Sequence, residues 1–176
     1  MDHLQRLTRA AIRERLGYTV GSDQLIQMAL DALMADLDTP ALRRLAGLNR
    51  NEEAEAHDLF DQVIHELELA PSLPDNPTQA RWELVRWWCR LIVDGSLPPE
   101  EGGRLIWIEG WEKLGHSPAL LPLISSVCGY EDWNEDFTDP RETCLEYIVT
   151  DARQLLTGPW PPTNTPDAVT EGHSQS

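Results

Sequence analysis

The chain lacks most of the features that mark a membrane, secreted or redox-active protein. No apolar run approaches the roughly 18 residues of a membrane-spanning helix. The N-terminus, MDHLQRLTRAAIRERLG, has no apolar core or cleavage site of a secretory signal, so we expect a cytoplasmic protein. Cys89, Cys128 and Cys144 form no C-x-x-C pair, and each lies in an apolar stretch, which predicts buried and reduced thiols.

Positive charge is scarce. The chain has 14 Lys and Arg, Lys113 being the only lysine, against 30 Asp and Glu, and its formal net charge is −16. Residues 1–50 are close to neutral, so the excess negative charge lies after them. Nucleic-acid phosphates are bound by compensating positive charge, so this surface argues against direct DNA or RNA binding. It favours a basic protein partner, with improved solubility as the simpler alternative.

Familiar catalytic motifs are also missing. Ser125 and Ser126 do not lie in a G-x-S-x-G turn, and no glycine-rich phosphate loop is present. In HELEL (residues 65–69), Leu69 replaces the second histidine of H-E-x-x-H. We therefore favour a non-enzymatic protein and expect no cofactor.

Helix punctuation, in contrast, is abundant. Six residues occupy N-cap positions, and prolines or glycines mark several helix starts and ends. The N-cap candidates are Ser22, Thr39, Asn51, Asn76, Ser117 and Asp139, and the helix-ending glycines are Gly17, Gly47, Gly95, Gly115 and Gly158. The predicted helices cover residues 3–16, 22–37, 40–46, 52–69, 77–93, 98–114, 118–128 and 140–157. No segment alternates as a strand does.

These elements predict an all-α fold, an irregular single-domain bundle of about seven to eight helices over residues 1–158. Residues 159–176 are rich in proline and polar side chains without periodicity, which predicts a disordered tail. Helix 52–69 has one apolar face, whereas helix 77–93 is apolar around most of its circumference and should be central. In helix 98–114, Gly103 and Gly110 lie beside tryptophans, which predicts a close helix crossing or a slot for a ring of a neighbouring helix.

The tryptophans of helices 77–114 have two interpretations. A continuous apolar arc at helical spacing favours core packing. The less favoured alternative is an enzyme or small-molecule-binding domain with a pocket beside these helices, or a partner groove at the same place. Its lining would be Trp87, Trp107 and Trp111, with Arg86, Arg90 and Glu109. A second copy of the chain completing the same arc is a further alternative, which would make the protein a structural subunit of a homo-oligomer.

Two patterns resemble metal sites, and we expect neither to bind a metal. Asp132, Asn134 and Asp136 follow the D-x-N-x-D order that begins a calcium loop. That loop needs a sharply turning sixth residue and a twelfth-position glutamate, where this chain has Phe137 and Thr143.

The second pattern is a helical stripe of His57, Asp61 and His65. A single stripe rarely encloses a transition metal, so a solvated face with local His–Asp pairs is the favoured interpretation.

The remaining functional hypothesis concerns the stretch GYEDWNEDFTDPRE, residues 129–142. Carboxylates among aromatic rings suit a basic partner, because charge steers the encounter and rings supply affinity. The predicted contact residues are Tyr130, Glu131, Asp132, Trp133, Glu135, Asp136 and Phe137. An adaptor or an immunity- or antitoxin-like inhibitor fits this description, and the acidic face of helix 52–69 is the other candidate surface.

Overall fold

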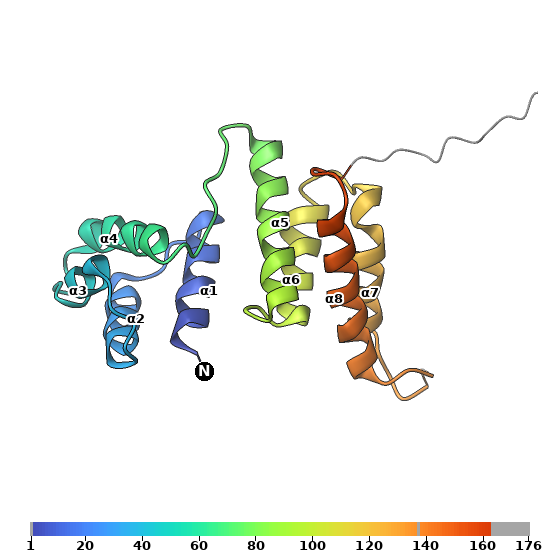
Figure 1. Cartoon of the computed structure of the whole chain (residues 1–176), viewed down its shortest axis with the longest axis horizontal. Coiled ribbons are helices and arrows are strands. Elements are labelled where there is room, and N and C mark those ends of the chain that lie inside the picture. The colour runs from blue at the N-terminus through green and yellow to red at the C-terminus, as the bar shows by residue number, and fades with distance from the viewer. Residues whose placement is uncertain (1, 137, 163–176) are drawn as a thin grey trace, which may run out of the picture. The chain divides into compact units, whose positions relative to one another are not determined.

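A computed structural model describes residues 2–136 and 138–162, and all regular elements within them are helices (Figure 1). The first four are α1 (His3–Arg15), α2 (Ser22–Met34), α3 (Pro40–Ala46) and α4 (Glu53–Glu66). The next are α5 (Pro77–Asp94), α6 (Pro99–Leu105), the π-helix η1 (Ile106–Trp111), the 3₁₀-helix η2 (Pro118–Leu120), α7 (Leu121–Glu131) and α8 (Arg141–Thr157). The all-α prediction is confirmed for these residues. None of the described helices has the length and apolar character needed to cross a membrane.

The contacts divide the chain into two compact units, Met1–Ser72 and Leu73–Ser176. The first unit contains α1 to α4 and the second contains α5 to α8. The sequence predicts one domain over residues 1–158. That the two units unfold together as one domain stays a prediction.

Two helix starts are capped as predicted. Thr39 and Asn76 each accept a hydrogen bond from the backbone N–H three residues ahead, at 3.3 and 3.0 Å, and each precedes a proline. Such a cap contributes roughly 1 kcal/mol. Ser22 is wrong as a cap, because it lies inside α2 and its hydroxyl donates to the Arg50 carbonyl at 3.2 Å. The starts of α4, η2 and α8, predicted at Asn51, Ser117 and Asp139, have no side-chain cap bond.

Helix ends follow backbone conformation more than residue type. Gly17 and Gly95 adopt φ of 82° after α1 and α5, as predicted for glycines that end helices. Asp36 and Glu68 adopt the same left-handed region, at φ 63° and 51°. For this reason α2 and α4 end before the predicted boundaries at residues 37 and 69. A residue with a Cβ pays about 1–2 kcal/mol for this conformation.

The core of the first unit forms where α2 packs against α1, α3 and α4. The predicted apolar face of helix 52–69 is buried in it, and the salt bridge between Arg6 and Asp31, at 2.7 Å, joins α1 to α2. The largest fully buried side chains here are Phe60, Leu7, Leu25, Leu42, Leu45, Leu59 and Ile64. Burying a leucine-sized side chain contributes about 1.5–3 kcal/mol.

In the second unit α8 packs against α5, α6 and α7, and Figure 1 shows α7 and α8 side by side. The predicted close crossing is confirmed by two buried glycines. A Cβ on Gly103 would lie 2.6 Å from Val127 Cγ2, and a Cβ on Gly110 would lie 2.7 Å from Val85 Cγ2. Only glycine lets these backbones approach so closely.

The predicted helix 98–114 changes register in its second half. After Leu105 the chain forms the π-helix η1, and the bonds from Glu112 N–H to the Trp107 carbonyl (3.1 Å) and from His116 N–H to the Trp111 carbonyl (2.9 Å) span five residues. A π-helix widens the turn, and in this segment Gly110 faces Val85.

The predicted disordered tail, residues 159–176, lies outside the described residues from 163 onward. Residues 159–162 are described, and Trp160 is half-buried against α5. Its ring meets that of Trp82 edge to face with centroids 5.8 Å apart, and the Arg86 guanidinium lies 5.6 Å from its centroid. Trp160, two residues past the predicted domain boundary, thus contacts α5, and the boundary at 158 stays a prediction.

Candidate functional site

The acidic loop, residues 130–139, joins α7 to α8 and is held by its own hydrogen bonds. The indole N–H of Trp133 donates to the Asp139 carbonyl at 2.9 Å, and the Asp136 N–H donates to Asn134 Oδ1 at 2.9 Å. The Arg141 guanidinium lies 4.2 Å from the Tyr130 ring centroid. Trp133 and Tyr130 are both half-buried; the Trp133 ring is oriented by a bond within the loop and the Tyr130 ring by Arg141 of α8.

The loop presents four predicted partner-binding carboxylates to solvent. Glu131, Asp132, Glu135 and Asp136 are all exposed, and Glu131 pairs with Arg104 of α6. Among residues 2–136 and 138–162, the other three carboxylates form no ion pair. The structure therefore brings six of the seven predicted contact residues together, and the seventh, Phe137, lies outside the described residues.

Residues of the calcium-loop pattern form hydrogen bonds with one another. Asn134 Oδ1 accepts the Asp136 N–H, and the Asn134 side-chain N–H donates to the Asp132 carbonyl at 3.5 Å. These bonds form an Asx turn, which is a common structural use of asparagine. No group of three or more His, Cys, Asp or Glu side chains in the described chain has the arrangement of a metal site.

The stripe on α4 does not form the predicted His–Asp pairs. His57 Nδ1 lies 3.4 Å from Glu14 Oε1 of α1, and Asp61 pairs with Arg15 at the same distance. His65 is exposed. Two of the three stripe residues therefore pair with side chains of α1 within the first unit, which the spacing within one helix could not reveal.

A pocket that the sequence did not predict lies beside the acidic loop, between α7 and α8. We call it the loop pocket, and its volume is about 420 Å³. It is lined by Ser125, Ser126 and Gly129 of α7, by Thr138 and Asp139 of the loop, and by Cys144 and Tyr147 of α8. These residues carry no recognisable motif, because they come from three separate segments.

Two hydrogen bonds orient the hydroxyls of the loop pocket. Ser126 Oγ donates to Asp151 Oδ2 of α8 at 2.6 Å, and Tyr147 Oη donates to Asp139 Oδ2 at 3.4 Å. The pKa of the Tyr147 hydroxyl is raised, chiefly by the negative charge of Asp139, which disfavours a phenolate.

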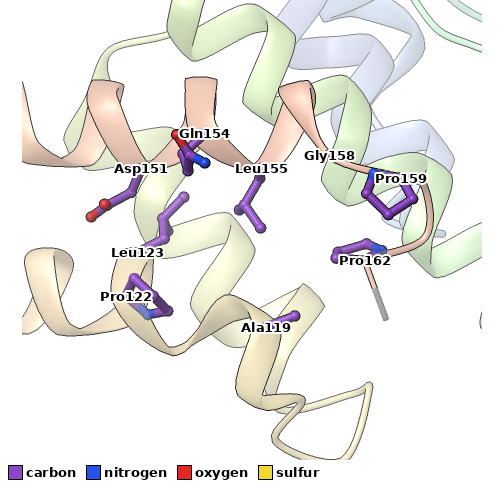
Figure 2. Close-up of a pocket in the computed structure, with 9 residues that line it drawn as sticks. All are labelled: Ala119, Pro122, Leu123, Asp151, Gln154, Leu155, Gly158, Pro159 and Pro162. Carbon is purple, nitrogen blue, oxygen red and sulfur yellow. The ribbon is translucent and has the colours of Figure 1, made fainter. Parts of the chain in front are cut away.

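A second pocket, of about 160 Å³, lies where the C-terminal half of α8 faces the start of α7 (Figure 2). Prolines and leucines form its walls, among them Pro122, Leu123, Leu155 and Pro159. Figure 2 shows the Asp151 carboxylate pointing away from Leu155 and Pro159, consistent with its bond to Ser126. This pocket thus offers little charge.

The residues predicted for the alternative pocket beside helices 77–114 differ in exposure and in their partners. Trp87 is buried, Trp107 and Trp111 are half-buried, Arg90 is exposed, Arg86 lies against Trp160, and Glu109 accepts a hydrogen bond from Arg81 at 3.2 Å. Neither the loop pocket nor the pocket of Figure 2 is lined by these residues. The Trp-lined pocket stays a prediction, whereas Trp88 is a fully buried core residue.

All three cysteines are free thiols. Burial raises the pKa of Cys89 to about 12, so its thiol stays protonated at neutral pH. The pKa of Cys128 is also raised, first by burial and then by the charge of Asp132. Cys89 and Cys144 are buried as predicted, whereas Cys128 is half-buried.

Comparisons of the chain with protein-family models, with curated proteins and with solved structures found no match. Functional inference for this all-α protein therefore depends on its own residues.

Proposed function

We propose that this protein is a non-enzymatic binding module that docks on a basic surface of a protein partner through the acidic loop. An adaptor, or an immunity- or antitoxin-like inhibitor, would work in this way. A cytoplasmic location belongs to the same proposal.

The observation that supports the proposal is the hydrogen-bonded, described part of the acidic loop. Asp132, Glu135 and Asp136 are exposed without a cationic partner in the described chain, next to a Trp133 ring held by its bond to Asp139. A preorganised loop loses less conformational entropy on binding than a mobile one. Exposed carboxylates steer a basic partner, and a nearby tryptophan provides apolar contact area.

The test is capture of partners from native extract with the tagged full-length protein, at low and high salt. We expect a bound protein that is retained at about 50 mM salt and largely lost at about 500 mM, because screening shortens the reach of surface charges. The triple variant Asp132→Asn, Glu135→Gln, Asp136→Asn should lose the same protein even at low salt.

A matched control separates specific docking from net charge. The triple variant Glu53→Gln, Glu55→Gln, Asp58→Asn removes three exposed charges from α4 and leaves the loop intact. We expect it to retain the partner. Equal losses from both variants would mean that only net charge matters, and loss from the α4 variant alone would place docking on the other acidic surface.

A further inference from the structure

The loop pocket presents acceptors and lacks a cation. None of its lining residues is Lys, Arg or His, and one of them, Asp139, is a carboxylate. Asp139 Oδ2 accepts from Tyr147, while its other oxygen makes no hydrogen bond to a described residue. One carboxylate oxygen is thus available beside the cavity.

Two of the four hydroxyls that line the pocket, those of Ser126 and Tyr147, have their hydrogens turned toward carboxylates. A hydroxyl has one O–H donor and two acceptor lone pairs. The Ser126 hydroxyl donates to Asp151 and the Tyr147 hydroxyl donates to Asp139. The oxygens of Ser126 and Tyr147 can therefore only accept further hydrogen bonds. These two oxygens and the Asp139 carboxylate favour an occupant with several N–H donors, and the hydroxyls of Ser125 and Thr138 can accept as well as donate.

We propose that the loop pocket binds the guanidinium group of an arginine side chain presented by the partner. Guanidinium has five N–H donors and a permanent positive charge, which matches the Asp139 carboxylate and the acceptor oxygens of Ser126 and Tyr147. A lysine ammonium has the right charge but three donors on one atom, so it reaches fewer of these separated oxygens. This inference rests on the proposed function, because the partner is the source of the arginine.

One further observation supports a cationic occupant, and a second allows the pocket to be filled. The Asp139 charge that raises the pKa of Tyr147 also favours a cation at the same place. The α7 side of the pocket is open as well: a Cβ on Gly129 would meet no atom within 4 Å. Side chains can therefore be introduced at Gly129 to fill the pocket without displacing a neighbour.

The experiment adds n-butylguanidinium as the probe to isotope-labelled full-length protein. Binding is measured by NMR as changes in the amide chemical shifts. We expect saturable shifts centred on Gly129, Asp139 and Tyr147, and a lower pKa of Tyr147 in the bound form. Asp139→Asn keeps the size of the side chain and an oxygen for Tyr147 but removes the charge. It should weaken binding about tenfold or more.

Controls address shape and folding. Gly129→Leu should abolish binding by filling the pocket, and Gly129→Ala, which adds one methyl group, should retain most of it. The uncharged analogue n-butylurea should not bind. Two results would overturn the proposal. One is a set of probe-induced amide shifts that covers the whole acidic loop and is the same in Asp139→Asn. The other is binding of n-butylurea as tight as that of n-butylguanidinium. Binding of n-butylammonium as tight as that of n-butylguanidinium would overturn the preference for arginine.

The two proposals fail in different ways. The NMR experiment contains no partner, so absence of probe binding removes the arginine pocket and leaves the loop-docking result from capture intact. A partner that is lost from the loop triple variant but retained by Asp139→Asn and Gly129→Leu would show docking without the pocket. Loss of the partner from all these variants supports both proposals.

Discussion

Replacing Gly103 by alanine tests the close packing of α6 against α7. The new Cβ would lie 2.6 Å from Val127 Cγ2 and 3.5 Å from Ile148 Cγ2. The second distance is an ordinary contact, whereas the first is a clash. Val127 is fully buried and β-branched in a helix, so its side chain has essentially one rotamer and cannot turn aside.

The size of the effect follows from two opposing terms. Alanine inside a helix is favoured over glycine by roughly 0.5–1 kcal/mol. Overpacking a close-packed core costs about 1–3 kcal/mol. We therefore expect Gly103→Ala to lower the free energy of unfolding by about 1–2 kcal/mol. Gly129→Ala has the helix gain alone, since its Cβ meets nothing within 4 Å, and should raise that free energy by up to about 1 kcal/mol.

Urea unfolding followed by tryptophan fluorescence measures both variants. All seven tryptophans lie at residue 82 or later, so fluorescence reports on the second unit alone, whereas far-ultraviolet circular dichroism reports on helices of both units. If residues 1–158 form one cooperative domain, as the sequence predicts, the two transitions should coincide for wild type and variants. Separate midpoints would identify two domains.

A double-mutant cycle isolates the clash. In a Val127→Ala background the offending Cγ2 atom is absent, so Gly103→Ala should become neutral or stabilising. Our reasoning is refuted if Gly103→Ala stabilises the wild-type protein as Gly129→Ala does. An unchanged cost of Gly103→Ala in the Val127→Ala background would refute it equally.

Two other predictions concern titratable groups. Hydrogen bonds from Gln27 and, to a smaller extent, from Arg6 lower the pKa of Asp31 below its ordinary value of 3.8. The ionised carboxylate therefore stabilises the fold above pH 3.8, and this contribution is lost as the pH falls through the lowered pKa. Asp31→Asn should therefore lower the urea midpoint at pH about 7, and the difference from wild type should shrink at pH about 3; a pH-independent difference would contradict this origin. For the thiols, Ellman's reagent should modify Cys89 only after unfolding, because burial raises its pKa to about 12, whereas half-buried Cys128 should react first. Rapid modification of Cys89 in the native protein, located by mass spectrometry, would contradict its burial.

The helices were predictable because their signals are local. Thr39 and Asn76 cap the helices that begin beside them, and the positive φ of Gly95 ends α5 where the glycine predicts. The missed ends of α2 and α4 have the same backbone geometry at Asp36 and Glu68, residue types that do not usually signal it. Local patterns fail to predict a helix end where a residue type that rarely ends helices adopts the left-handed conformation.

The candidate site was predictable only in its acidic loop, which is contiguous in sequence. The loop pocket depends on α7 lying beside α8, and its orienting bond joins Ser126 to Asp151, 25 residues apart. Similarly, His57 pairs with Glu14 of another helix instead of with Asp61 of its own. Partners of this kind are chosen by tertiary packing, which periodicity within one segment cannot specify.

The contact of Trp160 with Trp82 has a practical consequence for shortened versions of the protein. A chain cut at Gly158, where composition places the end of the helical part, would lose the ring that covers Trp82 and lies against Arg86. Two amphipathic side chains on α5 would then face water, and such a fragment would be a poor choice for crystallisation. A boundary at Pro162 keeps the ring in place, so expression trials should begin there.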